Sequence, residues 1–281
     1  MLTLSSASNF SLTDLAELVN RAFKGYIGGE VHFSEALMAS MLVSAGVDLA
    51  LSQVASFDDE PVAVALISRR ATAYRLALMG VAGGSQERGF GSQFMNELID
   101  QARAAGVQTY ELEVIIGNLR GERLYKRCGF QIVQRLASFK SSEGTVAVQG
   151  DPSRLEHVPL MDVARLMVAN ADADSPWQVD GWGLPHAHPI AGLSVRYRDD
   201  DGDAYIAAGL TDATPIPIRA LVVTGKRRAG LATRAVASLM ATYPGKQWGV
   251  PAICPEKYAP IFNACGMTEG AIAQFQMRLA L

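Results

Sequence analysis

Apolar residues recur at helical spacing in several parts of this 281-residue chain, and short apolar runs bounded by turn residues lie between them. Ser11 and Asp14 have the pattern of a helix cap, and a second helix is expected over 34–45. Two strands, over 50–56 and 62–68, are expected to form a hairpin around an acidic turn with a proline. The elements expected to complete this first unit are a strand over 74–81, a helix to about residue 105, a strand over 110–116, a short helix over 121–127 and a strand over 131–140.

The pattern starts again after residues 141–151, whose small and polar side chains are typical of a linker or long turn. A helix over 162–169 and a loop over 175–189 come first. Two strands, 193–198 and 205–210, are then expected on either side of an Asp201-Gly202 hairpin turn. Candidates for strand, helix, strand and helix follow to the C-terminus.

The composition narrows the class of protein. Hydrophobic residues make up 49% and charged residues 19%, as in globular proteins. The net charge of -3 argues against non-specific nucleic-acid binding, which needs a strong basic excess. No apolar run approaches the roughly 18 residues of a membrane-spanning helix, so no membrane partner is expected. The N-terminus lacks a secretory pattern and the three cysteines follow no disulfide or CxxC spacing, so we expect a cytoplasmic protein.

A glycine-rich segment after the strand at 74–81 is the first candidate ligand-binding site. It reads Val81-Ala-Gly-Gly-Ser-Gln-Glu-Arg-Gly-Phe-Gly91 and opens a helix. Gly89 and Gly91 let the backbone turn sharply and approach a ligand, while the amides at a helix N-terminus favour an anion. The spacing matches neither a dinucleotide-binding motif nor a P-loop. Taken alone, the segment therefore leaves an ordinary helix start as an alternative.

This segment resembles the acetyl-CoA pyrophosphate loop of the GNAT superfamily of N-acyltransferases, Val-x4-Gln/Arg-x2-Gly-x-Gly/Ala. The family also carries an asparagine and a tyrosine on a strand and short helix downstream. Asn118 and Tyr125 stand at those positions here, followed by Gly129-Phe130. Two motifs in the right order extend the resemblance over at least residues 50–140, and they imply acetyl-CoA as a co-substrate.

Both motifs recur in the second half of the chain. Val222-Val-Thr-Gly-Lys-Arg-Arg-Ala-Gly-Leu-Ala232 repeats the loop between an apolar strand and a helix, and Tyr258 to Met267 repeats the second motif. Phe262 replaces Tyr125 there, and Pro255 stands where Asn118 would align. We therefore expect an α/β (α+β) chain of two tandem GNAT-like domains, 1–145 and 150–281, each a mixed, mostly antiparallel sheet flanked by helices. The first is expected to be catalytic and the second, with its degenerate motif, structural or regulatory.

The resemblance implies a role for each matching residue. The strand ending at Val81 would offer backbone amides to the thioester carbonyl, and Tyr125 would protonate the departing thiolate as a general acid. Asn118 would contact the pantetheine arm or order a water. Packing as a core aromatic is the alternative for Tyr125. The residues expected at acetyl-CoA are Met79, Gly80, Val81, Gln86, Glu87, Arg88, Gly89, Phe90, Gly91, Ser92, Asn118 and Tyr125, with Arg227, Gly230 and Ala232 in the second copy.

Other signals carry less weight. Glu111 and Glu113 share one face of a strand, where either is a candidate general base or simply a solvated side chain, and His32 is a further candidate. His186 and His188 lack further ligands, so no metal is expected. The basic residues 226–228 lie inside the second loop, where pyrophosphate is a simpler partner than nucleic acid.

Two functions stay open from the sequence. The first is an N-acetyltransferase that moves an acetyl group from acetyl-CoA to a primary amine by direct attack. The second is a non-catalytic acetyl-CoA-binding or regulatory protein built from the same fold. The sequence does not identify the acceptor, and it is compatible with a monomer or a homodimer.

Overall fold

The computed structural model describes residues 2–29, 32–83, 89–142, 148–179, 181–186, 192–209, 215–226 and 230–281. These residues form two compact units. Unit 1 comprises Met1–Val133 together with Phe275–Leu281, and unit 2 comprises Gln134–Gln274. In the described part of the chain no helix combines the length and the apolar character needed to span a bilayer.

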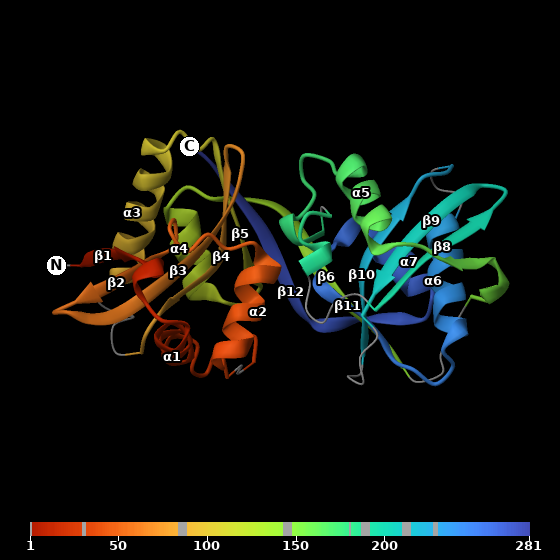
Figure 1. Ribbon diagram of the computed structural model, residues 1–281, viewed down its shortest axis with the longest axis horizontal. Helices are drawn as coiled ribbons and strands as arrows, with labels where there is room; N and C mark the ends of the chain where they lie inside the picture. The colour runs from red at the N-terminus through yellow and green to blue at the C-terminus, as the bar shows by residue number, and fades with distance from the viewer. Residues whose placement is uncertain are drawn as a thin grey trace. The chain divides into compact units, whose positions relative to one another are not determined.

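The sheet of unit 1 is mixed and mostly antiparallel (Figure 1). Its antiparallel neighbours are β1 to β2, β2 to β3 and β3 to β4, whereas β4 and β5 run parallel. The strands, in their order across the sheet, are β1 (Thr3–Ser6), β2 (Gln53–Phe57), β3 (Glu60–Arg70), β4 (Ala73–Val81), β5 (Thr109–Ile115) and the last residues of β12 (Met267–Ala280).

Helices cover both faces of this sheet. Helices α1 (Leu12–Ala22) and α2 (Glu35–Ala45) pack on the face that carries Val54, Val64 and Leu66. Helix α3 (Phe90–Ala104) packs with α4 (Leu119–Arg127) on the face formed by the alternate strand residues. The expected cap of the first helix is confirmed, because the Asp14 amide donates to Ser11 Oγ at 3.1 Å and the Ser11 amide donates to Asp14 Oδ2 at 3.1 Å.

The last strand of unit 1 comes from the C-terminus of the chain. Met277 is fully buried in the core under α3, and the Leu281 amide donates to the Gln108 carbonyl at 3.0 Å. The strand expected to close the first unit, β6 (Gln131–Ser141), instead pairs with β11 (Trp248–Pro255) in unit 2. That expectation was wrong because the apolar pattern of a strand reports burial and does not name the neighbouring strand. The strand β12 itself was not foreseen.

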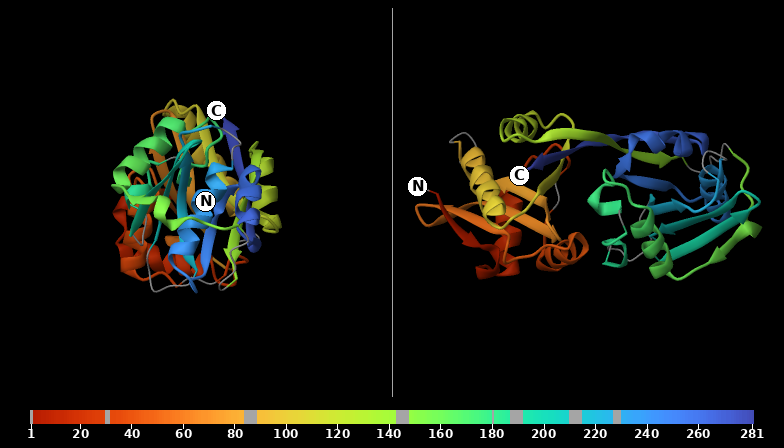
Figure 2. Two further views of the ribbon diagram at one scale, coloured as in Figure 1. Left: turned by 90° about the vertical axis from the view of Figure 1, so that its right-hand side faces the viewer. Right: turned by 90° about the horizontal axis from the view of Figure 1, so that it is seen from above.

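Unit 2 repeats the plan with its own core. Strands β10 and β11 are parallel, and the other paired strands are antiparallel. Helix α5 packs against Ala207, Ala220 and Val222, and helix α6 packs against the alternate residues, so the two cover opposite faces (Figure 2, left). The remaining elements are β7 (Leu155–His157), α5 (Leu160–Asn170), β8 (Leu193–Asp199), β9 (Gly202–Ala208), β10 (Ile216–Val223), α6 (Leu231–Thr242) and α7 (Ala259–Ala264).

Short 3-10 helices link these elements. They are η1 (Ala7–Asn9), η3 (Pro152–Arg154), η4 (Trp177–Val179), η5 (Leu184–His186) and η6 (Glu256–Tyr258). The fold class expected from the sequence, a mixed and mostly antiparallel sheet flanked by helices, is confirmed in both units. The hairpin turns at Asp58-Asp59 and Asp200-Asp201 occupy corresponding places in their units. The second turn lies one residue before the expected Asp201-Gly202, because Gly202 already pairs with Asp199.

Candidate active site

The end of β4 separates from β5 in unit 1. The two strands pair from Ala73↔Thr109 to Leu76↔Leu112, and a bulge at Ala77 follows in β4. From Met79 to Val81 the strand keeps its pairing with β3. Among the described residues the pairing of β4 with β5 stops at Leu76↔Leu112, before Met79 to Val81.

Helix α3 begins at a glycine in the left-handed conformation. Gly89 is the N-cap, with φ 76° and ψ 2°, and no side chain caps the helix. A left-handed N-cap favours glycine, and the first amides of a helix have no partner within the helix. Phe90 is buried, and its ring lies 5.0 Å from that of Phe57. The Ser92 amide is turned inward, where it donates to the Gly89 carbonyl at 3.1 Å.

Gly91 brings three elements together. A Cβ placed on Gly91 would lie 3.7 Å from Val81 at the end of β4 and 3.6 Å from Leu124 in α4. These are ordinary contact distances, so the first turn of α3 packs directly on both neighbours. The expected loop residues Gln86, Glu87 and Arg88 lie outside the described residues.

Asn118 is the N-cap of α4. Its Oδ1 accepts a hydrogen bond from the Gly121 amide at 3.1 Å, which fixes the orientation of the side-chain amide. A Cβ on Gly121 would meet Asn118 Nδ2 at 2.9 Å, so a glycine at this position makes room for the cap. Asn118 therefore has a structural role in α4 in addition to any contact with a ligand.

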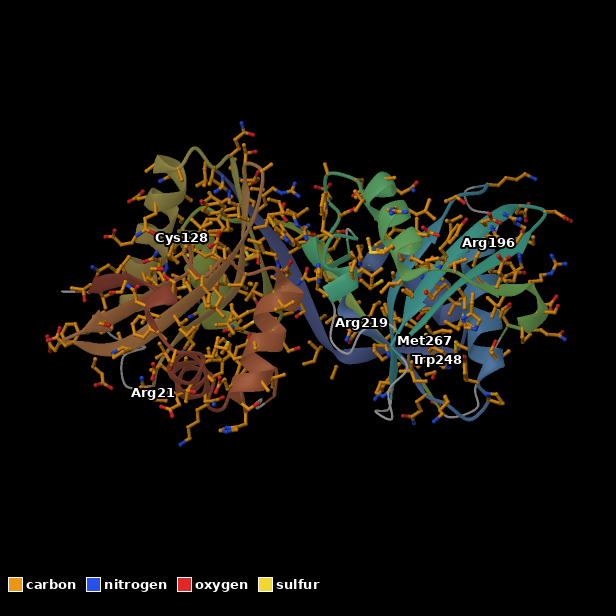
Figure 3. The ribbon with its side chains drawn as sticks, in the orientation of Figure 1. Arg21, Cys128, Arg196, Arg219, Trp248 and Met267 are labelled. Carbon is orange, nitrogen blue, oxygen red and sulfur yellow. The ribbon has the colours of Figure 1, made fainter. Side chains whose placement is uncertain are left out.

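Tyr125 lies on α4 one and a half to two turns after the cap and is half-buried. Its ring meets Phe130 edge-on at 5.9 Å. Burial raises the pKa of Tyr125 well above the ordinary tyrosine value, and the neighbouring Tyr26 and Cys128 raise it further. The phenol therefore keeps its proton at neutral pH. Cys128, labelled in Figure 3, ends the same helix and lies 3.6 Å from Asn96 Oδ1 of α3.

Tyr26, in the loop after α1, joins this group of residues. Burial raises its pKa, and a hydrogen bond with the Asn118 side chain partly offsets that effect. Because Asn118 Oδ1 is engaged by Gly121, Nδ2 is the atom left to donate to the Tyr26 oxygen. The ring of Phe23, which meets Tyr26 edge-on at 5.0 Å, lies against Gly80: a Cβ there would be 2.6 Å from it. Sequence reasoning missed Tyr26, since no motif marks it.

The candidate general bases are held in ion pairs. Glu113 Oε2 lies 2.7 Å from Arg75 Nη2, and both side chains are almost fully buried. Glu111 Oε1 accepts from Arg278 Nε at 2.8 Å. His32 is exposed.

The second copy keeps the backbone of the first but not its side chains. Gly230, the N-cap of α6, has φ 75° and ψ 6°, almost the values of Gly89, and Ala232 lies in the first turn. Phe262 on α7 is buried and stacks on Phe139 at 5.3 Å. Pro255 ends β11. The expected ligand Arg227 lies outside the described residues.

The remaining signals form no site in the described parts of the chain. No group of three or more histidine, cysteine, aspartate or glutamate side chains there could hold a metal ion. His186 is exposed, and His188 lies outside the described residues.

Residues 17–130 match the model of the acetyltransferase (GNAT) family. The matched segment covers less than half of the chain. It contains β2 to β5, α3 and α4, and with them every described residue of the candidate site in unit 1. A search of curated proteins found no match to the chain.

Solved structures share the fold over the whole chain. A GCN5-related N-acetyltransferase from Anabaena variabilis is 14% identical, with a TM-score of 0.66 over 99% of this chain and 72% of that one. One from Sphaerobacter thermophilus is 15% identical, with a TM-score of 0.64 over 99% and 95%. A tandem GNAT protein from the clavulanic acid biosynthesis pathway is 13% identical, with a TM-score of 0.60 over 100% and 98%. At these identities the likeness establishes the GNAT fold and nothing finer.

Proposed function

We propose that unit 1 transfers an acetyl group from acetyl-CoA to a primary amine. The observation that supports this most is the convergence of three elements at Gly91. The end of β4 at Val81, the start of α3 and helix α4 at Leu124 all lie in contact there. The amides of α3, the backbone of β4 and the phenol of Tyr125 on α4 would then act on one ligand.

The described residues fit the coenzyme. The N-cap Gly89 has no side chain to bond the first amides of α3, and the Ser92 amide bonds back to the Gly89 carbonyl, so the amides of Phe90 and Gly91 are the ones proposed to bind a pyrophosphate. No atom of the described residues lies within 4 Å of a Cβ placed on Gly89, so these residues leave space beside the turn. By resemblance, Gln86, Glu87 and Arg88 would complete the loop.

The proposed chemistry is a direct transfer. The amine nitrogen bonds to the thioester carbonyl carbon, the carbon–sulfur bond breaks, and the amine loses a proton to water. Backbone amides of Met79 to Val81 would polarise the carbonyl, and Tyr125 would give its proton to the departing thiolate. Tyr26, through Asn118, would hold the site on its acceptor side.

Unit 2 is proposed to be a second, non-catalytic copy. A phenyl ring cannot donate a proton, and Phe262 is packed into the core where Tyr125 would correspond. One neighbour of the same fold is a tandem GNAT protein, which supports the proposal that the chain is a tandem pair. The bounds expected from the sequence, 1–145 and 150–281, differ from the two units in residues 134–145 and 275–281. We further propose that the protein acts in the cytoplasm, as a monomer or homodimer, without a nucleic-acid or membrane partner.

One observation favours the alternative of a non-catalytic acetyl-CoA-binding protein. Both carboxylates considered as general bases are engaged by arginines. Direct attack needs only a neutral amine and a water to take the proton, so the lack of a carboxylate base does not remove the first proposal.

Two measurements on the full chain test the proposal. Calorimetric titration with acetyl-CoA reads affinity and stoichiometry, and release of the free thiol in the presence of a panel of primary amines reads turnover. Binding with amine-dependent release supports the acetyltransferase. Binding without release under any amine supports the alternative, and no binding at millimolar ligand rejects both.

A further inference from the structure

In unit 2 an acidic hairpin lies against the second glycine loop. The Lys226 amide donates to the Asp201 carbonyl at 2.8 Å, and the Thr224 amide donates to the Asp203 carbonyl at 2.9 Å. The two backbones touch at glycines: a Cβ on Gly202 would lie 2.4 Å from the Cα of Gly225. The turn between β8 and β9 is therefore fixed on the residues that lead into the loop.

The carboxylates of this hairpin reach the start of α6. Arg234, in the first turn of that helix, donates from Nε to Asp199 Oδ2 at 2.8 Å and from Nη2 to Asp201 Oδ2 at 2.8 Å. Lys226 Nζ also lies 3.4 Å from Asp201 Oδ1. Lys226, which leads into the loop, and Arg234, at the start of the helix, are thus both paired with carboxylates of the hairpin.

The corresponding hairpin of unit 1 is built differently. Phe57 ends β2 as Asp199 ends β8, and it presents a ring to Phe90 at the start of α3. Gln93 follows Gly89 by the same number of residues as Arg234 follows Gly230. Asp58 and Asp59 in the turn are exposed. The start of α3 therefore faces an apolar hairpin end, whereas the start of α6 faces carboxylates.

We infer that the carboxylates of Asp199 and Asp201 stand in for a pyrophosphate in unit 2 and confine acetyl-CoA to unit 1. This inference rests on the proposed function. A pyrophosphate at the start of α6 would lie beside two carboxylates and would have to displace them from Arg234 and Lys226. The hairpin cannot move aside without breaking its own contacts. Its backbone packs on Gly225 at Gly202, and it accepts hydrogen bonds from the amides of Thr224 and Lys226.

Acetyl-CoA titration of three full-length proteins tests the inference. The unaltered chain is expected to bind one acetyl-CoA, and Gly89→Val, which places a branched side chain on a left-handed residue, to bind none. Adding Asp199→Asn and Asp201→Asn to Gly89→Val removes two negative charges and leaves Arg234 positive. This variant is expected to regain one acetyl-CoA site per chain, which Gly89→Val alone lacks.

A control variant with the same charge change in unit 1 tests whether the effect belongs to the hairpin of unit 2. Asp58→Asn with Asp59→Asn in the Gly89→Val chain makes the same charge change on the other hairpin and is expected to restore nothing. Two sites in the unaltered chain, or no site gained from the Asp199 and Asp201 changes in a chain that still unfolds cooperatively, would overturn the inference while leaving unit 1 as a coenzyme site. No binding by the unaltered chain would overturn the proposed function instead.

Discussion

At the scale of single residues, the phenol of Tyr125 has the properties of a proton donor. Burial and its neighbours Tyr26 and Cys128 raise its pKa, so the donor form is fully populated near neutrality. The same raised pKa makes the phenolate costly, so the proton must return soon after transfer. Tyr26 is expected to fix the position of Tyr125, because it bonds to Asn118, the N-cap of the helix that carries Tyr125.

Replacing Tyr125 with phenylalanine removes only the hydroxyl. We expect acetyl-CoA affinity to be unchanged and turnover to fall at least tenfold, because general acid help typically contributes about 10²–10⁴-fold. Titration calorimetry and initial rates of thiol release measure the two effects. The control is Tyr258→Phe, an exposed tyrosine of unit 2, which should change neither. A Tyr125→Phe protein as fast as the unaltered one would assign the residue a packing role only.

Gly80 is expected to tolerate no side chain. A Cβ there would lie 2.6 Å from the ring of Phe23 and 2.7 Å from the Cβ of Ala22, so Gly80→Ala must displace the end of α1. We expect a loss of about 1–3 kcal/mol in the free energy of unfolding, measured by urea denaturation. Gly83→Ala is the matched control, because nothing lies within 4 Å of its Cβ position. Equal stability of the two variants would contradict the close packing of Phe23 and Ala22 against Gly80 of β4.

At the scale of elements, the β8–β9 hairpin is a charge-dependent part of unit 2. Burial opposes ionisation of Asp199, but the Asp201 amide and Arg234 outweigh it and lower the pKa of Asp199. Arg198 lowers the pKa of Asp203. A carboxyl whose pKa is lower in the folded state stabilises the fold above its ordinary pKa of about 4, and this contribution is lost as the pH falls through the folded value.

The lowered pKa of Asp199 predicts how the stability of an Asp199→Asn variant depends on pH. Near pH 6 the variant should be less stable than the unaltered chain, because it lacks the charged partner of Arg234. Below about pH 4 the unaltered chain loses the same contribution, so the difference in unfolding free energy should shrink. Urea denaturation at a series of pH values measures it. A difference that stays constant down to pH 2 would mean that Asp199 does not titrate with folding.

The elements themselves were largely predictable, because their signals are local. The Ser11 cap, the 3.6-residue spacing of α3 and the hairpin turns each lie within a few residues. The glycine at the start of α3 and Asn118 at the start of α4 were predicted from motifs for the same reason. Tyr26 and the pairs Arg75–Glu113 and Arg278–Glu111 were not, since their partners are far away in sequence and no short pattern records them.

At the scale of the whole molecule, the two units exchange the strands that would have closed them in chain order. Gln134 and the rest of β6 after it lie in unit 2, and Phe275 to Leu281 lie in unit 1. The sequence repeat predicts two similar copies, yet each copy has a strand edge that either late strand could satisfy. Which strand does so depends on packing over the entire chain, and this could not be read from the pattern of either strand.

A chain that ends at Gln274 should lose the coenzyme site, although every residue of the proposed site is retained. Its unit 1 would lack the partner of β5, the buried side chain of Met277 and the ion pair between Glu111 and Arg278. We expect acetyl-CoA binding to be abolished in titration calorimetry and the unfolding of unit 1 to lose its cooperativity. Met277→Ala should already cost about 2–5 kcal/mol by urea denaturation, whereas the volume-conserving Met277→Leu should cost less than about 1.5 kcal/mol. Unchanged acetyl-CoA affinity of the shortened chain would contradict this prediction. It would mean that the sheet of unit 1 forms without β12 and that the coenzyme site does not depend on the exchange of strands.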